Sequence, residues 1–204
     1  SNIDDSSLGR GRVILLRRDP AETFGWRVVS TLNHNNFTRS AGNAQEVGDE
    51  YGYEVKLDGN FLFVSSRGFD HYDYSATPPT HLRENTGVVF IYTRTNESSD
   101  TWNHFQTIYD PGSGGLLPVE GERFGHSLAH EDGTLVIGAQ RSYIPGSRPN
   151  PQCGIMGEIF IYENTGPNGS FEYVVSFDWS DIASQSLSGD SGYGDPEPVN
   201  CIGI

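Results

Sequence analysis

The run from Gly189 to Gly194, GDSGYG, contains the residue types of a nucleophilic serine site. Gly-Asp-Ser-Gly surrounds the nucleophile of one large class of serine proteases, which makes Ser191 a candidate for acyl transfer. That chemistry needs a histidine base oriented by an aspartate and a backbone oxyanion hole. The protease signature continues with Gly-Pro, whereas Tyr193 follows here, and no matching histidine segment lies upstream. A serine hydrolase at Ser191 is therefore a remote alternative, and we assign no catalytic residue.

A second group of chemically active side chains lies in the insertion GFDHYDYSATPPTHL, with Asp70, His71, Asp73 and His81. Hard cations such as calcium need several oxygens that converge from one short loop. The tight turns KLDGNF and HEDGTL are too short and too poor in carboxylates for that purpose. A Tyr- and Pro-rich insertion is more typical of a solvated loop. The sequence therefore predicts no metal ligands and no cofactor.

This insertion and the segment RSYIPGSRPNPQCGIM are the two candidate binding loops. Long loops on a rigid scaffold are where binding function concentrates. Each loop separates the second and third strands of a repeat described below, so we expect both on one face. The alternative is that they only cover the edges of neighbouring repeats. Their aromatic and Arg residues are of the types that anchor interfaces: Tyr72, Tyr74, Arg141, Tyr143 and Arg148.

Three Asn-x-Ser/Thr sequons favour a secreted glycoprotein. Asn96 and Asn168 fall in polar turns between a third and a fourth strand, and Asn36 follows an outer strand, so all three should be exposed. In an oxidising compartment, Cys153 and Cys201 either form a disulfide or leave Cys201 as a buried thiol. These features predict an extracellular or cell-surface location.

The charge balance excludes two classes of partner. The chain has 27 acidic and 13 basic residues and a net charge of -14, which repels phosphate backbones and anionic headgroups. No apolar run approaches the roughly 20 residues that a membrane helix needs. We therefore expect no nucleic-acid partner and no membrane insertion. The first residues lack the apolar stretch of a signal peptide, so we interpret the sequence as a mature form or an excised piece.

Internal repetition indicates the elements that carry these residues. Three segments begin with Gly and continue as an apolar strand, and each is followed 14 or 15 residues later by an aromatic that opens another strand. An aromatic-Gly pair, followed by a strand, an Asp-Gly turn and a strand, also recurs. The three Gly–aromatic repeats are Gly11 and Trp26, Gly87 and Trp102, and Gly157 and Phe171; the two pairs are Tyr51-Gly52 and Phe124-Gly125.

One repeat unit therefore has four short strands in about 70 residues, and the chain has no apolar 3.6-residue period long enough to indicate a substantial helix. In GVVFIYTR, from Gly87, both faces of the predicted strand are apolar, as expected for a sheet sandwiched between two neighbours. This pattern predicts an all-β fold and a β-propeller of four-stranded blades. A β-sandwich is the alternative, although it has no reason to repeat at this spacing.

The repeats resemble the FG-GAP repeat, the blade unit of the integrin α-subunit propeller. Phe124-Gly125 matches the family's Phe-Gly, Gly138-Ala139 its Gly-Ala, and Gly157 to Tyr162 its following strand. In the other copy, Tyr51-Gly52 replaces Phe-Gly and Ser65-Ser66 replaces Gly-Ala. The resemblance implies that the aromatic-Gly strand is innermost in each blade. Integrin-type blades often carry calcium loops, but these turns lack the motif, so calcium would bind only elsewhere in a longer chain.

The repeats divide residues 1–204, a single partial propeller, into about three blades. We expect two outer strands at 10–32, complete blades at 48–109 and 121–178, and the start of a further blade at 187–204. Closed propellers usually have at least four blades. The sequence therefore predicts a partial or open propeller that is completed by further blades of the same polypeptide or by other chains. The function expected from the resemblance is non-enzymatic protein recognition, adhesion or structural assembly; the alternative is lectin-like glycan binding between blades.

Overall fold

The computed structural model of this chain is built from antiparallel β-sheets, which confirms the all-β prediction. The structure describes residues 11–33, 49–73, 80–111, 121–142 and 156–178. Within these ranges the only helical element is a single 3-10 turn at Pro167–Gly169. Two four-stranded and two two-stranded sheets account for the strands.

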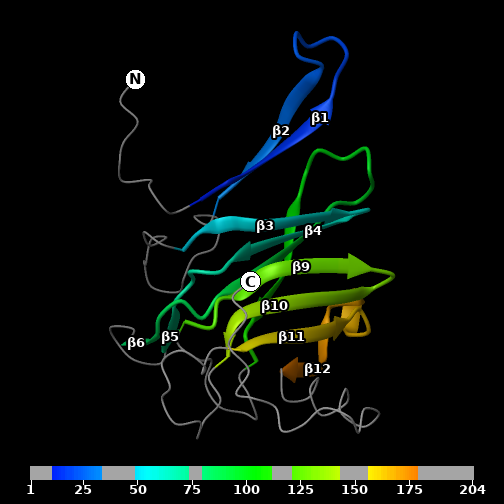
Figure 1. Cartoon of the computed structure of the whole chain (residues 1–204). Coiled ribbons are helices and arrows are strands. Elements are labelled where there is room, and N and C mark those ends of the chain that lie inside the picture. Colours follow the sequence, from blue (N-terminus) through cyan, green and yellow to red (C-terminus); the bar gives the residue numbers. More distant parts are fainter. Residues whose placement is uncertain (1–10, 34–48, 74–79, 112–120, 143–155, 179–204) are drawn as a thin grey trace, which may run out of the picture.

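The first hairpin pairs β1 (Val13–Arg18) with β2 (Trp26–Leu32). The central sheet has the order β3-β4-β7-β8, and the β9–β12 sheet follows its strands in chain order. Figure 1 shows the first hairpin at one end, the central sheet in the middle and the β9–β12 sheet at the other end. The remaining bounds are β3 (Tyr51–Asp58), β4 (Phe61–Ser66), β7 (Val88–Thr93), β8 (Asn103–Tyr109), β9 (Phe124–Glu131), β10 (Thr134–Ser142), β11 (Met156–Glu163) and β12 (Glu172–Asp178).

The same backbone contact joins each unit to the next. Gly11 forms a parallel bridge with Tyr51, and Gly87 forms the equivalent bridge with Phe124. Both glycines have positive φ values, 75° and 87°. A Cβ at either position would overlap the backbone of the aromatic residue opposite. Each of these two positions therefore requires glycine for two reasons: its positive φ and the close approach of two backbones.

Two hydrophobic cores fill the spaces between the three layers. The first lies between the first hairpin and the central sheet and contains Val13, Leu32 and Tyr51. The second lies between the central sheet and the β9–β12 sheet and contains Phe63, Phe124 and a row of aliphatic and aromatic side chains from β10 and β11. Each core therefore lies between two consecutive layers, and the first hairpin contributes Val13, Leu32 and the partly buried Leu15 to the first core.

Strand β7 is buried on both faces, as its two-sided apolar pattern predicted. Val88, Phe90 and Tyr92 belong to the first core, whereas Val89 and Ile91 belong to the second. All five side chains are at most 3% exposed. A strand with a layer on each side needs this pattern because neither face meets water.

The structure corrects two local predictions. The β3–β4 turn is Gly59-Asn60 rather than Asp58-Gly59, because Asp58 pairs with Phe61 as the last residue of the ladder. The β9–β10 turn is Asp132-Gly133, as predicted, and both residues have positive φ. The insertion after β4 was predicted to be a loop, but it forms a small hairpin of β5 (His71–Asp73) and β6 (Thr80–Arg83).

Candidate functional site

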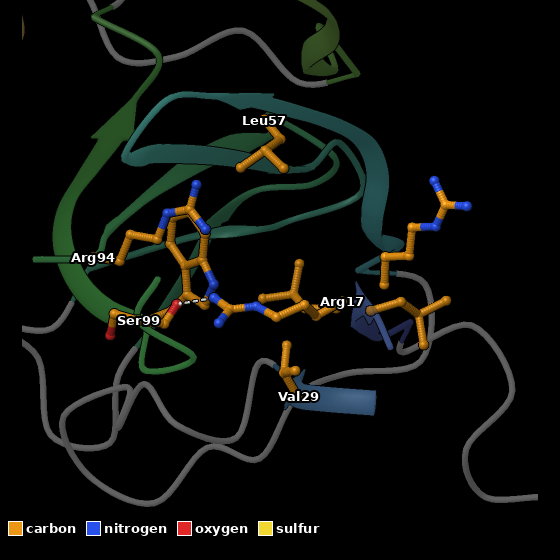
Figure 2. Close-up of a pocket in the computed structure, with 9 residues that line it drawn as sticks. Arg17, Val29, Leu57, Arg94 and Ser99 are labelled. Carbon is orange, nitrogen blue, oxygen red and sulfur yellow. Dashed lines mark hydrogen bonds between the residues drawn. The ribbon is translucent and has the colours of Figure 1, made fainter. Parts of the chain in front are cut away.

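A groove lies where the first hairpin meets the central sheet (Figure 2). Its volume is about 230 Å³. Leu57 from β3 lies on one side in Figure 2 and Val29 from β2 on the other, with Arg17, Arg94 and Ser99 between them. The rest of the lining is supplied by Leu15, Leu16, Arg18 and Trp102.

Arg17 fastens the first hairpin to the loop between β7 and β8. Its guanidinium donates hydrogen bonds to the carbonyl oxygens of Glu97, Ser98 and Ser99 at 3.1, 2.6 and 2.9 Å. It also forms an ion pair with Asp100 at 2.8 Å. Several donors on one planar group suit a turn whose carbonyls point the same way. The Arg17 side chain therefore acts as a clamp between two repeat units.

Arg94 forms the second cationic wall of the groove and is likewise engaged. Its guanidinium donates to the carbonyl oxygens of Gly59 at 2.7 Å and Glu97 at 3.1 Å. The same group lies 4.9 Å from the ring centre of Trp102, within the range of a cation–π contact. Because one face of the Trp102 ring is covered in this way, that face is not available to stack on a sugar. The guanidinium groups of Arg17 and Arg94 are thus both engaged with the protein itself.

The outer face of the first hairpin is apolar and open to solvent. Ile14, Leu16 and Trp26 are 50%, 54% and 56% exposed, and Val28 beside them is 58% exposed. Leu16 and Val28 are register partners on the two strands, so these side chains form one continuous patch. We call these four residues the hairpin face. Large contiguous apolar patches on a protein surface are candidate interaction sites.

The repeat shows what this hairpin face corresponds to inside the stack. Ile14, Leu16 and Trp26 lie 3, 5 and 15 residues after Gly11. The residues 3, 5 and 15 positions after Gly87 belong to the first core or pack against it. The residues 3, 5 and 14 positions after Gly157 belong to the second core. The central-sheet equivalents are Phe90 (3% exposed), Tyr92 (2%) and the half-buried Trp102; those in the β9–β12 sheet are Phe160 (1%), Tyr162 (4%) and Phe171 (3%).

At the opposite end of the stack, the described residues leave a partly exposed apolar face of the complementary kind. Ile159 on β11 is 41% exposed, whereas its central-sheet equivalent, Val89, is fully buried against β9–β12. Ile161 is half-buried, and its equivalent, Ile91, is fully buried. Register places further apolar residues of β12 beside them. We call this surface the β11 face; it comprises Val136, Ile159, Ile161, Val175 and Phe177.

A cation–aromatic cluster links the aromatic-Gly strands of the two larger sheets. The Arg67 guanidinium lies 3.6 Å from the ring centre of Tyr53, and its Nη1 donates to His126 Nδ1 at 3.2 Å. The rings of Tyr53 and His126 stack at 5.4 Å. Burial lowers the pKa of His126, and the positive charges of Arg67 and Arg123 lower it further. The charge of Glu54 acts in the opposite direction. Protonation of this histidine would place a positive charge beside Arg67, which is itself ion-paired with Glu50.

His130 joins the same two sheets from inside the second core. Its Nδ1 lies 2.7 Å from Asp58 Oδ2, and its ring lies 4.7 Å from Phe63 and 5.6 Å from Phe171. The one-residue displacement of the β3–β4 turn leaves Asp58 in the ladder, where its carboxylate reaches this histidine. His130 is therefore a structural residue of the junction.

Four of the predicted site residues lie in the described part of the chain, on different elements. Asn96 and Asn168 are exposed between the third and fourth strands of their sheets, as expected for acceptors. Tyr72 lies in β5 and Arg141 in β10, so the structure places neither in a loop. Tyr74, Tyr143, Arg148, Asn36, Cys153, Cys201 and Ser191 lie outside the described residues.

The described part of the chain contains no group of three or more His, Cys, Asp or Glu side chains placed to hold a metal ion. It also contains no helix long and apolar enough to cross a membrane. The residues of the groove and the hairpin face were not identified from the sequence. Arg17 binds backbone carbonyls, which carry no sequence signal, whereas the two-sided apolar pattern of GRVILL would have indicated the hairpin face.

No protein-family model matches this chain, and no curated protein matches it significantly.

Proposed function

We propose that this chain is a non-enzymatic module of FG-GAP-like propeller blades that serves protein recognition or assembly. The two four-stranded sheets, each with its strands in chain order, and the recurrent Gly–aromatic bridge support a blade-type arrangement. A blade of this kind buries both faces of its sheet against neighbours. The first hairpin then corresponds to the outer half of one blade, and about three blades are represented.

One observation carries the functional proposal: the hairpin face is solvent-exposed, whereas its equivalents in both larger sheets are packed in a core. Ile14, Leu16 and Trp26 are the residue types that fill a protein interface, with the aromatic as the strongest anchor. An acidic protein with such a face is suited to a protein partner rather than to a nucleic acid. The exposed sequons at Asn96 and Asn168 support an extracellular or cell-surface location.

The test is photo-crosslinking from the hairpin face. A benzophenone amino acid replaces Leu16, which is 54% exposed, in cells that produce the protein. The control places the same amino acid at Asp132, an exposed residue of the β9–β10 turn, which belongs to a different sheet from the hairpin face. Adducts to a protein chain from position 16 and not from position 132 support recognition. Adducts only within one chain, or only to carbohydrate, contradict it, and the latter would favour the lectin alternative.

A further inference from the structure

The two open faces of this molecule are the two halves of an interface that it already forms twice. At each junction inside the stack, a face equivalent to the hairpin face packs against a face equivalent to the β11 face. At the second junction, for example, Phe160 and Tyr162 meet Val89 and Ile91. At the two ends of the described stack, the described residues leave a face of each type partly exposed, with Leu16 54% and Ile159 41% exposed.

We propose that copies of this chain associate head to tail, with the β11 face of one copy on the hairpin face of the next. This inference rests on the proposed function in protein assembly and names the partner. The second copy is the occupant because its β11 face is built from positions whose equivalents, Val89 and Ile91, already cover a face of the hairpin type within the chain. The interface is heterologous, since different surfaces of the two copies meet.

The contact has a built-in polarity. Each copy keeps one face of each type free after binding one neighbour, so association continues into a ring or an open stack rather than stopping at a symmetric dimer. A charge on either face would be desolvated against apolar side chains, at a cost that prevents association. Leu16 and Ile159 are exposed in the single chain, so a charge there leaves the cores of that chain intact.

The experiment uses the purified full chain and three variants: Leu16→Glu, Ile159→Glu and, as control, Tyr173→Glu. Tyr173 is 48% exposed but lies beside Tyr162 on the face directed at the central sheet, so it matches Ile159 in exposure and not in position. Sedimentation velocity over a range of concentrations gives the mass of each species. Circular dichroism and thermal unfolding establish that each variant is folded.

We expect the unmodified chain and Tyr173→Glu to form species larger than a dimer as concentration rises, and each of the other two variants to remain monomeric. Mixed in equal amounts, Leu16→Glu and Ile159→Glu should form one 1:1 dimer, because each keeps the intact face that the other has lost. Monomeric behaviour of the unmodified chain at all concentrations would overturn the proposal. So would a mixture that stays monomeric, because each variant supplies the intact face that the other has lost and the proposed contact should then form. A photo-crosslink from position 16 to a different protein would show that the partner is not a second copy of this chain. It would leave the proposed function in protein recognition unchanged.

Discussion

Replacement of Gly87 by Ala tests whether the close backbone approach at the Gly–aromatic bridge holds the layers together. Gly87 has a φ of 87°, and a Cβ there would lie 2.6 Å from the backbone nitrogen of Phe124 and closer still to its carbonyl oxygen. Gly133 is the matched control. Its φ is 82°, and a Cβ there would meet only the Asn164 Cβ at 3.7 Å, an ordinary contact.

The two substitutions share one cost and differ in another. Both place an L-residue in the left-handed region, which costs about 1–2 kcal/mol. Gly87→Ala also forces two backbones apart, at about 1–3 kcal/mol for the overlap. It further weakens the hydrogen bond from the Phe124 N–H to the Thr86 carbonyl, now 2.8 Å long, by about 1 kcal/mol. The expected difference between the variants is therefore about 2–4 kcal/mol.

Urea unfolding followed by tryptophan fluorescence measures this difference. With a denaturant dependence of about 2 kcal/mol per molar, Gly87→Ala should unfold at about 1–2 M lower urea than Gly133→Ala. Equal midpoints for the two variants would refute the reasoning, because the conformational cost alone would then account for both.

Three further predictions concern the clamp, the cation–aromatic cluster and the sequons. Arg17→Ala should lower the free energy of unfolding by about 1–2 kcal/mol, through the loss of donors to three carbonyls, and speed amide exchange in the β7–β8 loop; Arg18→Ala, at an exposed position, should change it by less than about 0.5 kcal/mol. His126 has a folded-state pKa below its ordinary value of 6.5, so the unfolded chain binds more protons and stability should fall as the pH drops from about 7 to about 5. His126→Gln should reduce that slope in urea titrations at the two pH values, and an unchanged slope would contradict the assignment. In a eukaryotic secretory host, intact-mass analysis should show the loss of one glycan in each of two variants, Asn96→Gln and Asn168→Gln.

The strand content and the repeat were predictable because they depend on residue type at fixed spacing. The glycines at 11 and 87 and the two-sided strand after Gly87 were identified from the sequence, and the structure shows why each is needed. The β3–β4 turn was misplaced by one residue because Asp58-Gly59 and Gly59-Asn60 are both good turn sequences. The interaction of Asp58 with His130, 72 residues away, is long-range, and local sequence does not encode it.

The two open faces show where residue type stops being informative. Trp26, Trp102 and Phe171 occupy equivalent positions and are all aromatic, yet Trp26 is 56% exposed and Phe171 only 3%. The difference depends on whether a layer lies in front of each aromatic, which is a property of the assembled stack. The Arg17 clamp was missed for a related reason, since its partners are main-chain oxygens of the β7–β8 loop.

The layered arrangement has a consequence for how the molecule folds. Among the described residues, the hydrophobic cores join each layer only to its neighbours in the stack. Stability is then a sum of layer terms and junction terms, as in a one-dimensional chain of coupled units. The central sheet has two junctions, whereas the first hairpin has one, formed by Val13, the Gly11 bridge and the Arg17 clamp. The hairpin should therefore open first and most often, with the central sheet as the last unit to lose its amide protection in native-state hydrogen exchange.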